Sequence, residues 1–129
     1  MNSRNPLRTV VAPLLCATAL ATLSACGGGT TAAPAPGTIP VEATDTTCGV
    51  TPPNAPKGKV TFQVTNKGTK TTEFYLYGPD NQVLSEVEGI GPGLTREMTV
   101  EAPQPGTYTT ACKPGMKGDG IRGSFTVTP

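Results

Sequence analysis

From Val41 onward, hydrophobic and polar residues alternate in short runs separated by clusters of Gly, Pro, Asn and Asp. In the clearest run, Val60, Phe62 and Val64 alternate with polar residues, which predicts a strand with one buried face. No segment keeps the spacing of an amphipathic helix, so two sheets are expected to cover each other. The pattern predicts an all-β sandwich of about seven strands, of which the first lies at an edge. The predicted strands span residues 41–45, 59–65, 71–77, 82–88, 94–101, 106–112 and 122–128.

One local motif supports the sandwich. The tetrapeptide Pro105-Gly106-Thr107-Tyr108 resembles a tyrosine corner, in which a buried Tyr ties the turn to the strand that follows. We therefore expect Tyr108 to be buried and to fasten the preceding turn.

The start of the chain has the pattern of an export signal. Arg4 and Arg8 precede the apolar run 10–23, which is too short to span a bilayer at about 20 residues per crossing. The run ends in Leu23-Ser24-Ala25-Cys26, which resembles the lipobox of bacterial lipoproteins. The alternative is an ordinary cleavage site that follows small residues. We expect Cys26 to carry lipid and to anchor the chain to the outer face of the cell membrane.

These segments divide the chain into three parts. Residues 1–25 are predicted to be a lipoprotein signal peptide, and residues 26–39 to be the lipidated Cys with a flexible Gly-, Thr-, Ala- and Pro-rich tether. Residues 40–129 are predicted to form the folded domain. Export places the thiols of Cys48 and Cys112 in an oxidising environment.

The composition excludes several function classes. The chain contains ten Lys and Arg and nine Asp and Glu, so it lacks the excess of basic residues that is typical of nucleic-acid-binding proteins. The absence of His removes the Ser-His-Asp and Cys-His catalytic arrangements and every metal site that needs imidazole. No enzymatic activity is therefore expected.

Two stretches carry a resemblance to a known fold. The sequences GKVTFQVTNKGTKTTEFYLYG and PGTYTTACKPGM resemble the cupredoxins, which implies a Greek-key β-sandwich. More narrowly, Cys48, Glu73, the stretch 86–93 and Cys112 resemble the EfeO-type cupredoxin-like domain, the N-terminal module of an extracytoplasmic iron-uptake component. That resemblance implies an iron or copper ion as cofactor. It also implies an iron permease or a helical metal-binding protein as partner.

The chain departs from the blue-copper pattern of two His, one Cys and a weak axial Met. By the resemblance, Glu73 stands at the first His, Met116 lies in the region of the second, and Cys112 keeps the thiolate position. No blue-copper centre is therefore expected. The resemblance implies a carboxylate and sulfur site with Cys48, Glu73 and Cys112 as first ligands, and Glu86, Glu88 and Met116 as further candidates.

Each candidate ligand has an alternative explanation. Cys48 and Cys112 could form a structural disulfide, which in the chain-entropy model stabilises the domain by roughly 4 kcal/mol. The Glu residues could belong to a solvated sheet face, and Met116 could fill the end of the sandwich. Two functions follow: a membrane-tethered metal-binding module linked to iron uptake, or a disulfide-stabilised interaction domain of the cell envelope without metal.

Overall fold

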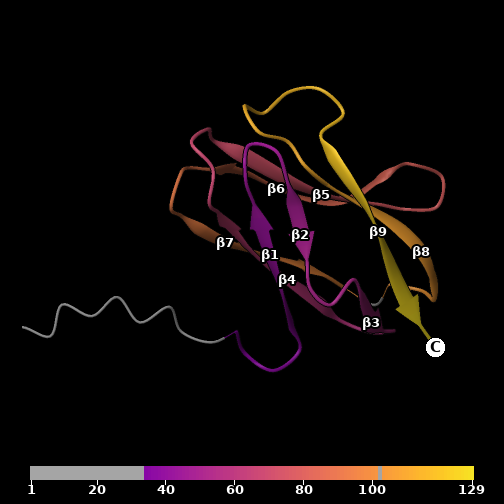
Figure 1. The fold of residues 1–129 in the computed structure, drawn as a ribbon. Helices are drawn as coiled ribbons and strands as arrows, with labels where there is room; N and C mark the ends of the chain where they lie inside the picture. Colours follow the sequence, from indigo (N-terminus) through magenta and orange to yellow (C-terminus); the bar gives the residue numbers. More distant parts are fainter. Residues whose placement is uncertain (1–33, 102) are drawn as a thin grey trace, which may run out of the picture. The chain divides into compact units, whose positions relative to one another are not determined.

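A computed structural model describes residues 34–101 and 103–129 of the chain. They form nine strands (Figure 1): β1 (Thr38–Ala43), β2 (Cys48–Val50), β3 (Asn54–Pro56), β4 (Val60–Asn66), β5 (Thr72–Tyr77), β6 (Val83–Ile90), β7 (Thr95–Val100), β8 (Gly106–Cys112) and β9 (Ile121–Thr128). The predicted signal peptide and Cys26 lie outside the described residues. The part of the chain that the structure describes contains no helix with the length and apolar character of a membrane span.

The strands form two sheets, as the alternating pattern predicts. Sheet A has the order β2-β1-β4-β7, and sheet B has the order β3-β9-β8-β5-β6. The inward side chains of both sheets make one core, in which the Phe62 ring contacts those of Phe74 and Phe125 at centroid distances of 5.3 and 5.1 Å. The all-β, Greek-key sandwich is confirmed.

The number and order of the strands differ from the prediction in two ways. The strands β2 and β3 were not predicted, because three residues are too few to show an alternating pattern. The first predicted strand, β1, lies inside sheet A between β2 and β4 rather than at an edge. It begins at Thr38 and buries Ile39 in the core, so two residues assigned to the tether belong to the fold.

The tyrosine corner is present. The buried Tyr108 donates its hydroxyl hydrogen to the backbone oxygen of Gln104 at 2.6 Å. This bond fixes the turn that leads into β8, and β8 carries Cys112 at its end.

At the same end of the domain as Cys112, a buried Asn fastens three segments. The Asn66 amide donates to the backbone oxygens of Lys70 and Ile90 at 2.8 and 2.7 Å, and its oxygen accepts from the Gly68 N–H. The Asp45 carboxylate accepts from the backbone and hydroxyl of Thr69, and this hydroxyl bond lowers the pKa of Asp45. The connection between β4 and β5 is therefore held in one position.

Candidate functional site

Two cysteines of the described domain are bonded to each other. Cys48 begins β2 of sheet A, Cys112 ends β8 of sheet B, and a disulfide joins them with a Cα–Cα distance of 5.5 Å. Both side chains face the interior, since Cys48 pairs with the buried Ala43 and Cys112 is fully buried in the core. The disulfide therefore crosslinks the two sheets through the core.

Glu73 lies on the opposite face of sheet B from Cys112. In the register of β5 and β8, Cys112 pairs with Phe74, and both side chains belong to the core. Successive side chains of a strand point to opposite faces, so Glu73 points outward. Its carboxylate accepts a hydrogen bond from the outward Tyr75 hydroxyl at 3.0 Å.

Of the first predicted ligands, the structure therefore brings Cys48 and Cys112 together as a disulfide and leaves Glu73 on the opposite face of sheet B. Within residues 34–101 and 103–129, no three Cys, Asp or Glu side chains gather as a metal-binding group. Glu86 pairs with Tyr75 across β5 and β6 and belongs to the same outer face as Glu73. Glu88 is exposed beside Gly89, whose positive φ of 65° accompanies a β-bulge in β6. Met116 lies in the connection between β8 and β9, 45% exposed.

The outer face of sheet B carries an aromatic cluster whose burial was not predicted from the sequence. The Tyr75 and Tyr77 rings stack at a centroid distance of 5.7 Å and are almost completely buried, with Ala111 beside them. Two cations cover the rings: the Lys113 Nζ lies 3.9 Å from the Tyr75 centroid, and the Arg122 Cζ lies 4.6 Å from the Tyr77 centroid. The available signal in the sequence was a pair of cations: Lys113 directly follows β8, and Arg122 lies in β9, whose pairing with β8 places it near the tyrosines.

Burial and hydrogen bonding keep the Tyr75 hydroxyl protonated. Burial raises the pKa of Tyr75 well above its usual range, and the hydrogen bond to Glu73 adds to the effect. Arg122 is held in place because its Nη1 donates to the Asn81 side-chain oxygen at 2.8 Å. The neutral Tyr75 hydroxyl thus serves as a donor to the Glu73 carboxylate rather than as a base.

Comparison with known proteins agrees with this architecture. The family model of the Cupredoxin-like domain matches residues 11–127. The chain belongs to the cupredoxin-like domain family. Among curated proteins, no sequence matches this one.

Solved structures show the same fold as this cupredoxin-like domain. Reduced auracyanin from Roseiflexus castenholzii is 21% identical with a TM-score of 0.57, over 74% of this chain and 100% of its own. Auracyanin B is 20% identical with a TM-score of 0.57, over 71% of this chain and 88% of its own. The azurin Az-iso2 from Methylomonas sp. strain J is 16% identical with a TM-score of 0.56, over 74% and 100%.

The residues of this cupredoxin-like domain do not fit a blue-copper centre. Such a centre binds copper through two imidazoles and a thiolate. The chain has no His, and the sulfur of Cys112 is bonded to Cys48. The fold is therefore shared with cupredoxins, while the ligand set that defines their copper site is missing from this sequence.

Proposed function

We propose that this chain is an exported cupredoxin-like binding module, tethered to the membrane through lipid on Cys26, that contacts another component of the cell envelope without a metal. The observation that carries the proposal is the disulfide between Cys48 and Cys112. A sulfur that crosslinks two sheets is not available as a thiolate ligand. The Greek-key sandwich then acts as a rigid support for its loops.

The disulfide suits this role energetically. It closes a sequence separation of 64 residues, for which the chain-entropy model gives about 4 kcal/mol of stabilisation. A small exported domain has a modest core, and a crosslink of this size offsets that weakness. The loops at the crosslinked end are then held for contact with a partner.

The test is the oxidation state of the two cysteines in the exported protein. Digestion without reduction, followed by mass spectrometry, is expected to yield a peptide pair linked through Cys48 and Cys112. Titration of the same protein with Cu(II) is expected to give no intense thiolate-to-copper absorption. Recovery of both cysteines as free thiols from freshly exported protein would contradict the proposal.

A second candidate, metal binding linked to iron uptake, is favoured by one observation. The Tyr75 hydroxyl lies 3.0 Å from the Glu73 carboxylate, and the residue Tyr75 pairs with Glu86 of the neighbouring strand. Three side chains with oxygen atoms that could bind a metal therefore share one face. Hard oxygen ligands suit ferric iron, and an iron permease or a helical metal-binding protein would be the partner. The Lys113 ammonium beside Tyr75 opposes a bound cation there.

The two candidates differ in their response to iron. In the metal candidate, titration with Fe(III) produces a phenolate-to-iron absorption band in the visible range. That band is absent in Tyr75→Phe and weakened in Glu73→Gln, whereas a matched Tyr108→Phe variant keeps it. In the metal-free candidate no band appears, and all four proteins behave alike.

A further inference from the structure

Strand β6 is the longest free edge of the sandwich. It is the last strand of sheet B and has eight residues, whereas the edge strands β2 and β3 have three residues each and β7 has six. Its backbone ladder is with β5, and no other strand in the described part of the chain pairs with it. Along residues 83–88, the backbone groups on its other side are therefore free to pair with an added strand.

A groove of about 390 Å³ lies beside this edge, between β6 of sheet B and the end of β7 in sheet A. Its lining includes Leu84, Ser85, Val100, Pro103 and Tyr108. Ser85 pairs with the buried Leu76, so its side chain points to the inner side of sheet B. Side chains that lie opposite each other on neighbouring strands share a face, so a residue added opposite Ser85 would point toward this groove. The groove is largely apolar and suits an apolar side chain.

The outer side of β6 carries negative charge. Glu86 pairs with the outward Tyr75, and Glu88 lies two residues further along the strand; both are exposed. Residues 83–101, which comprise β6, β7, their connection and the next residue, contain four Glu but only one basic residue, Arg96. The ion pair found within residues 34–101 and 103–129 involves neither Glu86 nor Glu88. An added strand would therefore meet two carboxylates without ion-pair partners on this side.

The nearest cations of this face are engaged on β5. Lys113, which follows β8, covers the Tyr75 ring, and Arg122 of β9 covers the Tyr77 ring. In the order of sheet B, β8 and β9 lie on one side of β5 and β6 lies on the other. These cations therefore approach the tyrosines from the side of β5 that is opposite to the free edge.

We propose that β6 accepts an added strand from a partner protein, and that this strand alternates basic and apolar residues. The main chain of the added strand pairs with the free edge, which supplies affinity, and its side chains supply specificity. Its basic side chains lie beside Glu86 and Glu88 on the outer face, and its apolar side chains enter the groove on the inner side. This inference rests on the proposed function and names the class of partner, since it assumes a domain that works by contact.

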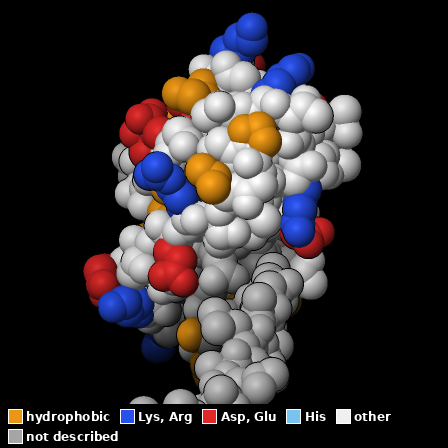
Figure 2. Space-filling model, turned by 90° about the vertical axis from the view of Figure 1, so that its left-hand side faces the viewer, with side chains coloured by type: hydrophobic (Ala, Val, Ile, Leu, Met, Phe, Trp, Pro, Cys, Tyr) orange, Lys and Arg blue, Asp and Glu red, His pale blue; other side chains and the backbone are white. Residues whose placement is uncertain are grey.

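The charge of the edge disfavours two other occupants. In an antiparallel pair of β6 strands centred on Val87, Glu86 of each copy lies opposite Glu88 of the other, and like charges in that position are destabilising. An anionic membrane surface is repelled by the same carboxylates. Charge alone does not single out a docking surface, because the face in Figure 2 carries Lys and Arg as well as Asp and Glu side chains. The unpaired backbone selects β6, and the charge selects the occupant.

The probe for the test is a synthetic peptide of alternating lysine and valine. It is added to the oxidised full chain in non-ionic detergent, and backbone amide chemical shifts and hydrogen exchange are followed. We expect the largest shifts at Ser85, Glu86 and Val87, and slower exchange of the amides on the free edge. A glutamine and valine peptide is expected to bind about fivefold more weakly or less. The lysine peptide with methylated backbone nitrogens is expected to lose binding, because it cannot donate to β6.

Matched neutralisations locate the contact. Glu86→Gln with Glu88→Gln is expected to weaken binding of the lysine peptide by about fivefold or more, because it removes the attraction along the edge. Glu42→Gln with Asp119→Asn makes the same change in net charge at two other exposed sites, and we expect an effect below about twofold. Leu84→Ala is expected to weaken binding without changing its dependence on salt. The methylated peptide tests the wild-type chain, so the result does not depend on how a variant folds.

Four outcomes would overturn the inference. The first is equal binding of the methylated peptide, which indicates attraction without strand pairing. The second is equal binding of the glutamine peptide, or equal weakening by both double variants. The third is dimerisation of the chain through β6 in the absence of peptide, which indicates a second copy. The fourth is a set of shifts at β6 caused by phosphatidylglycerol bicelles but not by the peptide. The proposed function would fail separately, through free thiols at Cys48 and Cys112, so the two failures are distinguishable.

Discussion

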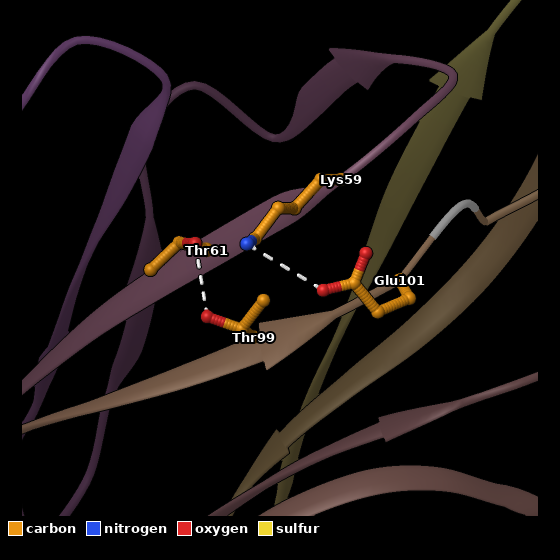
Figure 3. A network of polar contacts seen from close by, with 4 residues as sticks. All are labelled: Lys59, Thr61, Thr99 and Glu101. Atoms are coloured by element: carbon orange, nitrogen blue, oxygen red, sulfur yellow. Dashed lines mark hydrogen bonds and ion pairs between the residues drawn. The ribbon is translucent and has the colours of Figure 1, made fainter.

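The outer faces of the two sheets are built on different principles. On sheet A, threonines face solvent in cross-strand pairs, with Thr61 and Thr99 hydroxyls 3.0 Å apart and an exposed Lys59–Glu101 ion pair at 3.5 Å beside them (Figure 3). On sheet B, the outward Tyr75 and Tyr77 are buried under side chains of the same chain. One face is a solvated surface, and the other is a second, smaller core.

A single row of residues explains the difference. The register aligns Arg122, Ala111, Tyr75 and Glu86 across β9, β8, β5 and β6. The small Ala111 leaves space beside the Tyr75 ring, and Lys113, the residue after β8, covers that ring. Lys and Arg bury their stems on apolar surface while the charged ends stay in water. Aromatic residues can therefore occupy an outer face when neighbouring strands supply cations to cover them.

The largest expected effect comes from removing a ring of the covered face. Tyr75→Ala is expected to lower the free energy of unfolding by about 3 kcal/mol, because it removes a buried aromatic ring and takes away the stacking partner of Tyr77. The matched change on sheet A, Thr61→Ala, is expected to cost about 0.5 kcal/mol or less. Urea unfolding of both variants measures the difference. Equal losses would show that the two faces are energetically alike.

A smaller effect is expected from removing a covering cation. Lys113→Gln is expected to destabilise the domain by about 1 kcal/mol, because the cation–π contact with Tyr75 is lost and the ring gains exposure to water. Lys59→Gln breaks only an exposed ion pair and is expected to cost less than about 0.5 kcal/mol. Urea unfolding gives both values, and acrylamide quenching of tyrosine fluorescence reports exposure. Unchanged quenching in Lys113→Gln would contradict the covering role.

The sequence was sufficient for the fold but not for the site. Alternation in β4 is strong enough to assign its buried face, and the tyrosine corner could be read from four residues. The closeness of Cys48 and Cys112 was also anticipated, under either a disulfide or a metal site. Short strands such as β2 are determined by pairing with a neighbour, which a local pattern does not contain.

Whether Glu73 lies on the same face of sheet B as Cys112 depends on the register between β5 and β8. Cys112 pairs with Phe74 and not with Glu73, and this shift of one residue places the carboxylate and the sulfur on opposite sides of sheet B. Two residues on neighbouring strands can be identified from a sequence, yet the register that decides whether they meet is set by turns and packing across the whole sheet.

The last expected effect is of similar size and distinguishes the two faces by their response to pH. The pKa of Tyr75 is raised in the folded state, mainly by burial and then by its bond to Glu73. A raised pKa contributes stability that is fully present below the ordinary tyrosine value of about 10 and is lost as the pH rises above it. Tyr75→Phe is expected to lower the free energy of unfolding by about 1 kcal/mol at neutral pH, because the Glu73 carboxylate loses its donor.

The difference between wild type and Tyr75→Phe should therefore stay constant from neutral pH to about pH 9 and shrink above about pH 10, where the unfolded wild-type chain ionises. Urea unfolding at neutral pH and at about pH 9 and 11 measures it. Thr61→Val on sheet A is the control, since it removes a hydroxyl without an accessible pKa, and its difference from wild type is expected to be independent of pH. A wild-type advantage over Tyr75→Phe that persists unchanged at about pH 11 would mean that Tyr75 ionises equally well in the folded and unfolded chains, and that burial on the outer face of sheet B is not reflected in its titration.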